Sequence, residues 1–224
     1  MNLEDIMTLR GLRKTNPKYQ YLSKQTQALG FEIGVAFRFL KRDEGRRKDR
    51  SLASITNYYQ VGNISPTIIA EEYDPVVWQS LWWHPEAAFC QRTSLNSPHT
   101  IIVLHLTVEP DDRLFQAEVL TALTIMLTLL EGDKFEHHNT VPVMVVSVMG
   151  RMQARVLQFH YSHEGLVITK TRLMSFATME STTIGLGVMM GLMSSKAIGN
   201  TTDPSNILKL LRSVSYTRLL ISLQ

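Results

Sequence analysis

The segment between residues 141 and 176 constrains the fold more than any other part of the chain. It predicts three β-strands joined by short turns, at residues 141–149, 153–161 and 166–174. The first strand is apolar almost without a break, which is typical of a strand covered on both faces. Because the turns are too short for a crossover connection, the three strands are expected to pair antiparallel as a meander.

The second turn, which follows Tyr161, sets the register of that meander. A tight turn at this point pairs Leu157 with Lys170 and Arg155 with Arg172. Like charges directly opposite each other destabilise a sheet. The two arginines are therefore expected to need a carboxylate, a bound anion or open water beside them.

Other segments are expected to cover the meander. Residues 114–130, after a possible N-cap at Asp112, predict a buried helix with Glu118 as its one ionisable residue. Residues 100–108 predict a buried strand, and an amphipathic helix begins at Asn16-Pro17. The predicted fold class is α+β, with a mostly antiparallel mixed sheet around the three-strand meander at 141–174, packed against the 114–130 helix and amphipathic helices.

The remaining segments predict mainly helices and loops. Residues 51–73 predict a loop with one short strand, and Asp74-Pro75 starts a helix that His84-Pro85 ends. A further helix is expected at EAAFCQR, and residues 178–196 predict a close-packed helix or a lid. Asp203-Pro204 begins a last helix, followed by a strand at 216–223.

Composition indicates the number of domains and the cellular compartment of the chain. With no internal repeat or sharp shift in composition, residues 1–224 are expected to form a single domain. Residues 1–50, a basic helical N-terminal segment, hold 12 Lys/Arg and 6 Asp/Glu, so +6, against +3 for the whole chain. A single cysteine, Cys90, excludes an intrachain disulfide and indicates a reducing compartment, cytoplasmic or nuclear. The 114–130 helix is at the lower limit of the roughly 17–25 residues that span a bilayer. It is interpreted as a buried helix packed on the sheet, and no association with a membrane is expected.

The first functional hypothesis is a non-catalytic binding or interaction protein. It rests on the lack of any complete catalytic set, on the basic N-terminal segment and on the cluster Trp78, Trp82 and Trp83. Exposed aromatic side chains are enriched at protein interfaces. The partner is expected to be another protein or a second copy of the chain, and no cofactor is assigned.

A second hypothesis is nucleic-acid binding through the basic segment from Arg38 to Arg50. This segment holds seven basic and three acidic residues, and the adjacent Tyr58-Tyr59 pair offers rings for stacking on bases. The candidate phosphate contacts are Arg46, Arg47 and Lys48.

A third hypothesis is an enzyme with a polar pocket at the sheet. A helix packed on the meander would bring Glu118 over the strand face that carries the bases. The candidate catalytic residues are Glu118, Lys170, Arg155 and His160, with Arg172 and Gln158 as candidate binding residues. The histidines His137, His138, His160 and His163 could also meet at one sheet edge, but their spacing fits no metal motif, so no metal ligand is assigned.

Two resemblances accompany these hypotheses. The order helix, three strands, helix, strand over residues 112–223 resembles the restriction-endonuclease-like (PD-(D/E)XK) core, which implies that Glu118 matches its helix glutamate and Lys170 its lysine. The acidic strand positions of that family are absent, since Ile168-Thr169 precede the lysine and the second strand offers Gln158, so the resemblance implies a degenerate nuclease-like fold without its Mg²⁺ site. Residues 70–176 are similar to uncharacterised proteins of filamentous fungi, which implies a eukaryotic, intracellular setting and no activity.

Overall fold

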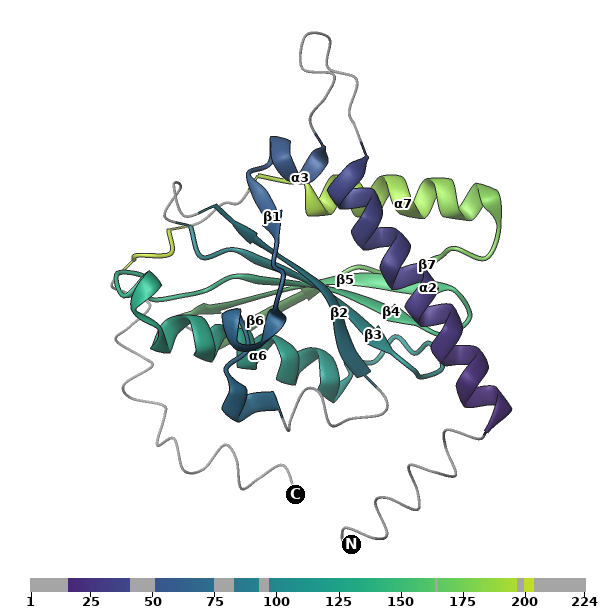
Figure 1. Cartoon of the computed structure of the whole chain (residues 1–224), viewed down its shortest axis with the longest axis horizontal. Helices are drawn as coiled ribbons and strands as arrows, with labels where there is room; N and C mark the ends of the chain where they lie inside the picture. Colours follow the sequence, from purple (N-terminus) through teal and green to yellow (C-terminus); the bar gives the residue numbers. More distant parts are fainter. Residues whose placement is uncertain are drawn as a thin grey trace, which may run out of the picture.

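A computed structural model describes residues 16–40, 51–74, 83–92, 97–163, 165–196 and 200–203. In this part of the chain the strands form one sheet with helices on both faces (Figure 1). The strands are β1 (Tyr58–Gln60), β2 (Trp83–Gln91), β3 (Thr100–Leu106), β4 (Val143–Met149), β5 (Gln153–Ser162), β6 (Gly165–Lys170) and β7 (Met174–Ser175). The helices are α2 (Pro17–Phe39), α3 (Leu52–Ile55), α4 (Ile64–Thr67), α6 (Gln116–Glu131) and α7 (Met179–Met193), with short 3₁₀ turns η2 (Glu71–Tyr73) and η4 (Asp133–Phe135).

The sheet is mixed and mostly antiparallel, as the sequence predicts. Its order is β1-β2-β3-β4-β5-β6, and β7 also pairs with β5. Only β3 and β4 among these neighbours run parallel. Parallel neighbours need a crossover connection, and α6 provides it. The α+β fold class is therefore confirmed.

The predicted meander is present as β4, β5 and β6. Leu157 lies opposite Lys170, as the tight turn requires. The predicted pair of Arg155 and Arg172 does not form, because β6 ends at Lys170 and the pairing resumes in β7 with a changed register, Ala154 opposite Met174. The break in the ladder thus removes the expected repulsion between two arginines.

The helices form one layer on each face of the sheet. In Figure 1, α2 and α7 cover one face, whereas α6 lies on the other. Alternate strand residues explain this: Val145 packs in the α6 layer, and Val146 packs in the layer of α2 and α7. The strands β3 and β4 are almost entirely apolar because both of their faces are covered.

The ends of the two long helices follow from their caps. At the start of α2, the Asn16 side chain accepts a hydrogen bond from the Lys18 amide, as predicted for an N-cap. The predicted N-cap Asp112 is wrong, since α6 starts after Phe115, whose amide donates to Glu118 Oε2 at 2.8 Å. None of the described helices is long and apolar enough to span a membrane.

The prediction of a helix at EAAFCQR is also wrong, because residues 83–91 form strand β2. Ala87 and Phe89 pack in the layer of α2, while Ala88 and Cys90 face the α6 layer. Pairing with β1 and β3 places β2 inside the sheet, where the two core layers bury its faces, and this burial overrides the helix propensity of the segment. Pro85 is tolerated because it lies at a β-bulge.

Candidate functional site

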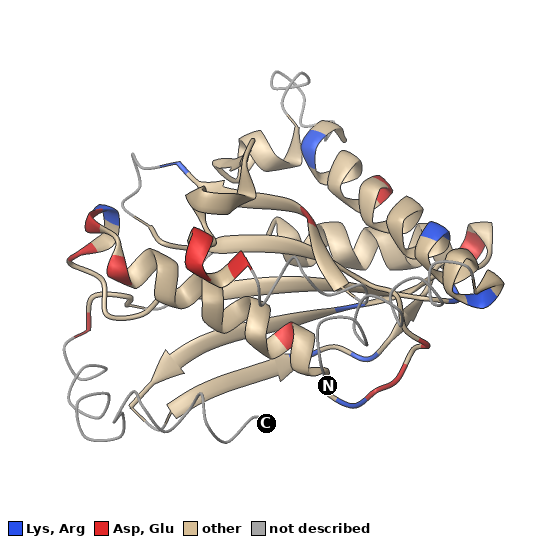
Figure 2. Ribbon diagram, turned by 60° about the horizontal axis from the view of Figure 1, so that its bottom comes forward, with Lys and Arg blue, Asp and Glu red and all other residues tan. Residues whose placement is uncertain are grey.

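Charged side chains are rare in the described sheet. Figure 2 shows them mainly on the helices and in the loops, with the strands almost free of them. The described strands contain only Glu86, Arg155 and Lys170. A charged side chain in or beside a core needs a polar partner. The polar clusters of the fold are therefore expected around these three residues.

The first cluster is the ion pair of Arg155 and Glu118, whose side chains are both fully buried. Arg155 Nε donates to Glu118 Oε1 at 2.9 Å, and Nη2 donates to Oε2 at 2.6 Å. The same guanidinium donates to three carbonyl oxygens, those of Asp111 (3.1 Å), Asp112 (3.0 Å) and Arg113 (2.6 Å). This arrangement ties the start of α6 and the preceding loop to β5.

Lys170 contacts Asp112 and not Glu118. Its Nζ lies 2.8 Å from Asp112 Oδ1, and that oxygen is 4.0 Å from Arg155 Nη1. Glu118 uses both carboxylate oxygens on Arg155 and also accepts the Phe115 amide. Glu118 and Arg155 therefore come together as the sequence suggests, but as a packed pair that presents no free carboxylate to a substrate.

His160 and Gln158 lie on the other face of the sheet. Alternation along β5 directs Arg155 to the α6 layer and residues 154, 156, 158 and 160 to the opposite layer, where Ala154 and Val156 are buried. The four candidate catalytic residues consequently do not form one site. His160 and Gln158 instead line a pocket.

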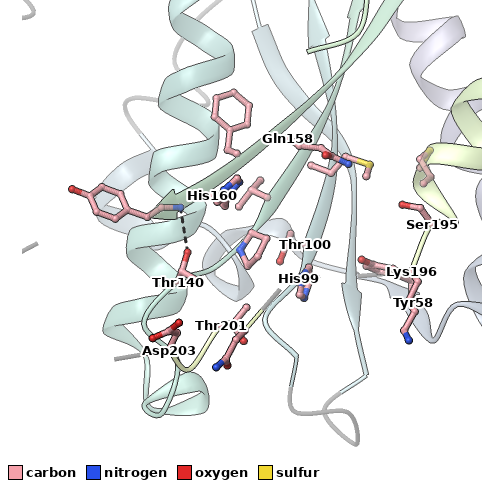
Figure 3. A pocket seen from close by; sticks show the side chains of 17 residues that line it. Tyr58, His99, Thr100, Thr140, Gln158, His160, Ser195, Lys196, Thr201 and Asp203 are labelled. Carbon is pink, nitrogen blue, oxygen red and sulfur yellow. Dashed lines mark hydrogen bonds between the residues drawn. The ribbon is translucent and has the colours of Figure 1, made fainter. Parts of the chain in front are cut away.

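The pocket has a volume of about 500 Å³. It lies where β3 and β4 begin, where β5 ends and where α7 ends (Figure 3). Its apolar surface is formed by Pro142, Val143, Met144, Phe159 and Met193. Its polar groups include Tyr58, Thr100, Gln158, His160, Lys196 and Asp203. Figure 3 shows Thr140, Thr201 and Asp203 on one side of it and Tyr58, Ser195 and Lys196 on the other.

Hydrogen bonds hold the wall of the pocket that contains residues 200–203. His138 Nδ1 and Thr201 Oγ1 are 2.7 Å apart, and the Asn139 amide donates to the Thr201 carbonyl at 2.7 Å. Asn139 Nδ2 donates to the Asp203 carbonyl at 2.8 Å. On the other side, burial foremost, and then nearby Cys90, raises the pKa of Tyr58 to about 12, so its hydroxyl keeps its proton.

The second polar cluster contains His84, Glu86 and His105. His105 Nδ1 lies 3.2 Å from His84 Nε2, which lies 3.5 Å from Glu86 Oε2. Burial foremost, together with the neighbouring His84, lowers the pKa of His105 to about 4. Among the described residues this is the one group of three side chains placed to hold a metal ion.

Sequence reasoning missed this cluster. It assigned His84-Pro85 to the end of a helix and residues 100–108, which include His105, to a buried strand, so it did not place the two histidines side by side. The available signal was the His-x-Glu spacing at 84–86, which carries ligand types before a buried apolar run. The histidines considered instead are separated: His137 pairs with Glu136 at 3.3 Å, and His138 is held by Thr201.

The other predicted binding residues have varied positions. Arg172 is exposed, and Trp83 is partly buried against the α6 layer. Trp78, Trp82, Arg46, Arg47 and Lys48 lie outside the described residues. Cys90 is buried, and burial raises the pKa of its thiol.

No protein-family model, curated protein or solved structure matches this chain. The resemblances to the restriction-endonuclease-like core and to the fungal proteins stay predictions.

Proposed function

We propose that this protein is a non-catalytic binding protein, cytoplasmic or nuclear, that takes a small organic molecule into the pocket beside Gln158 and His160. The observation that carries the proposal is a pocket of about 500 Å³ with an apolar surface and polar groups around it. Ligand sites are typically concave, mostly apolar, roughly 300–1,000 Å³ in volume, and carry a few polar groups that orient the ligand. The intracellular setting rests on the single cysteine of the chain.

The lining indicates the chemistry of the ligand. Lys196 and Asp203 contribute one charge of each sign, so the pocket favours a molecule with little net charge. Tyr58, Thr100 and Gln158 offer both donors and acceptors. A molecule with an apolar body and several hydroxyl or amide groups fits this combination best.

The ion pair of Glu118 and Arg155 supports a binding role over the enzyme alternative. The two side chains form hydrogen bonds with each other, and the guanidinium also donates to backbone carbonyl oxygens. Such an arrangement favours a structural role for this pair. An enzyme would have to use the pocket itself, with His160 as its titratable group. The nucleic-acid alternative depends on residues 46–48, outside the described residues.

A thermal-shift screen of the full chain tests the proposal. The probes are nucleosides, amino acids, sugars and small hydroxy acids, each tested with the wild type and with Gln158→Ala and His160→Ala. Gln153→Ala is the matched control, because Gln153 lies at the opposite end of the same strand. A ligand at about 100 times its Kd stabilises by about 2.7 kcal/mol, which raises Tm by roughly 5–10 °C at this chain length.

The expected result is a Tm increase in the wild type and in Gln153→Ala that is reduced at least by half in both pocket variants. Native mass spectrometry of the same samples should show one bound molecule. A panel without any hit would refute the proposal, as would hits that bind Gln158→Ala and His160→Ala as tightly as the wild type.

A further inference from the structure

We propose that His84, Glu86 and His105 form a binding site for a divalent transition-metal ion such as Zn²⁺, between strands β2 and β3 and helix α2. The three side chains each offer one ligand atom, and these atoms all lie within 4.8 Å of one another. The site is independent of the proposed function, because none of its residues lines the pocket.

The pairing of β2 with β3 places the three ligands on one face, beside a β-bulge. His84 lies directly opposite His105, and the register then shifts between Pro85 and Ala87, so Glu86 is the additional residue. In a regular strand residues 84 and 86 would share a face and Ala87 would point away, yet Ala87 packs in the α2 layer. The bulge therefore keeps His84, Glu86 and Ala87 on the α2 side.

The spacing of the ligand atoms fits a metal ion. With metal–ligand distances of about 2.0–2.2 Å, a tetrahedral site separates its ligand atoms by about 3.3–3.6 Å. The separation is 3.2 Å between the two histidines and 3.5 Å between His84 Nε2 and Glu86 Oε2, and the ligand atoms of His105 and Glu86 lie within 4.8 Å of each other. A hydrogen bond between the histidines accounts for the first distance, but it does not explain why the carboxylate converges on the same nitrogen.

A supporting hydrogen bond orients the buried ligand. His105 Nε2 lies 3.1 Å from Thr107 Oγ1, and both residues are buried. If Nε2–H donates to Thr107, the lone pair of Nδ1 points toward His84 and Glu86. Metal-binding histidines usually donate their other ring N–H in this way.

The site is reachable from solvent on one side. The His84 side chain is 38% exposed and that of Glu86 18%, so an ion can enter and water can complete its coordination. Helix α2 approaches with Gly30, where an added Cβ would lie 3.7 Å from Glu86 Cγ. Two imidazoles and a carboxylate favour Zn²⁺ and its neighbours over Mg²⁺ or Ca²⁺.

The test uses the full chain after treatment with a chelator and its removal. Isothermal titration with Zn²⁺ should give one equivalent bound with micromolar or tighter affinity, and Co²⁺ should give the visible absorption of a low-coordinate site. His84→Ala and Glu86→Gln should each weaken Zn²⁺ binding at least tenfold. Thr107→Val, which removes no ligand, should weaken it roughly tenfold.

His137→Ala is the matched control, because His137 is an exposed histidine beside a glutamate and lies outside the cluster. It should bind Zn²⁺ like the wild type, and circular dichroism should show that every variant is folded. Failure of the wild type to bind Zn²⁺ would overturn the proposal. Equal affinity in the wild type, His84→Ala and Glu86→Gln would overturn it as well.

Discussion

The buried ion pair gives the sharpest stability prediction. Arg155→Met keeps the apolar stem of the side chain and removes all five hydrogen bonds of the guanidinium. The Glu118 carboxylate then stays fully buried and keeps, among the described residues, the hydrogen bond from the Phe115 amide. Leaving one charge of a buried pair without its partner costs about 3–5 kcal/mol. We expect a loss of about 4 kcal/mol, a large part of the roughly 5–15 kcal/mol of a typical domain.

Urea unfolding followed by circular dichroism measures this loss. With an m value of about 2 kcal/mol per molar, a loss of 4 kcal/mol lowers the midpoint by about 2 M. Lys170→Met is the control, because it breaks the neighbouring pair with Asp112, which is 71% exposed. An exposed pair contributes only about 0–1 kcal/mol, so the control midpoint should move by less than about 0.5 M.

A double variant separates the buried charge from the lost packing. In Glu118→Gln with Arg155→Met the uncompensated charge is gone, so this protein should be more stable than the sum of the single changes by roughly 0.5–3 kcal/mol. The reasoning fails if Arg155→Met costs no more than Lys170→Met. It also fails if the two single changes are additive, because the charges would then not be coupled.

Three further predictions concern other parts of the fold. Gly187→Ala in α7 meets no atom within 4 Å and should stabilise by about 0.5–1 kcal/mol, whereas Gly185→Ala would press a Cβ to 3.0 Å from Phe176 and should show no such gain in urea unfolding. Burial lowers the pKa of His105 from 6.5 to about 4, so protonation below pH 6.5 favours the unfolded chain. In the presence of a chelator, the free energy of unfolding should therefore fall by about 3 kcal/mol between pH 6.5 and 4. A His105→Gln variant with an equal loss would contradict this. Burial raises the pKa of Cys90, so iodoacetamide should modify it far more slowly in the native protein than in urea, and equal rates would show that the thiol is accessible.

The parts of the fold that could be predicted are those with local signals. The almost continuous apolar run of β4 and the tight turn after β5 determine a meander and its register, so Leu157 opposite Lys170 follows from the sequence. Strand β2 could not be predicted in this way, because its residues favour a helix and its strand state depends on partners elsewhere in the chain. The break in pairing after Lys170 likewise has no signal in the sequence spacing.

The candidate sites follow the same division. The idea that Glu118 would meet a base on the meander needs only a helix packed on a strand face, and Arg155 is that base. The contact between His84 and His105 joins residues 21 positions apart and exists only once β2 pairs with β3. The pocket joins residues 58 to 203 from six separate segments, so no local pattern contains it.

The position of the two proposed sites on β3 bears on whether they act together. Thr100, at the start of the strand, lines the pocket, and His105, near its end, belongs to the metal cluster. Five residues of extended strand separate them by about 16 Å, so a ligand in the pocket cannot coordinate the ion. We therefore expect Zn²⁺ to leave the Tm increase caused by a pocket ligand unchanged. A ligand whose stabilisation requires Zn²⁺ would show instead that the two sites are coupled through the strand and the helix layer above it.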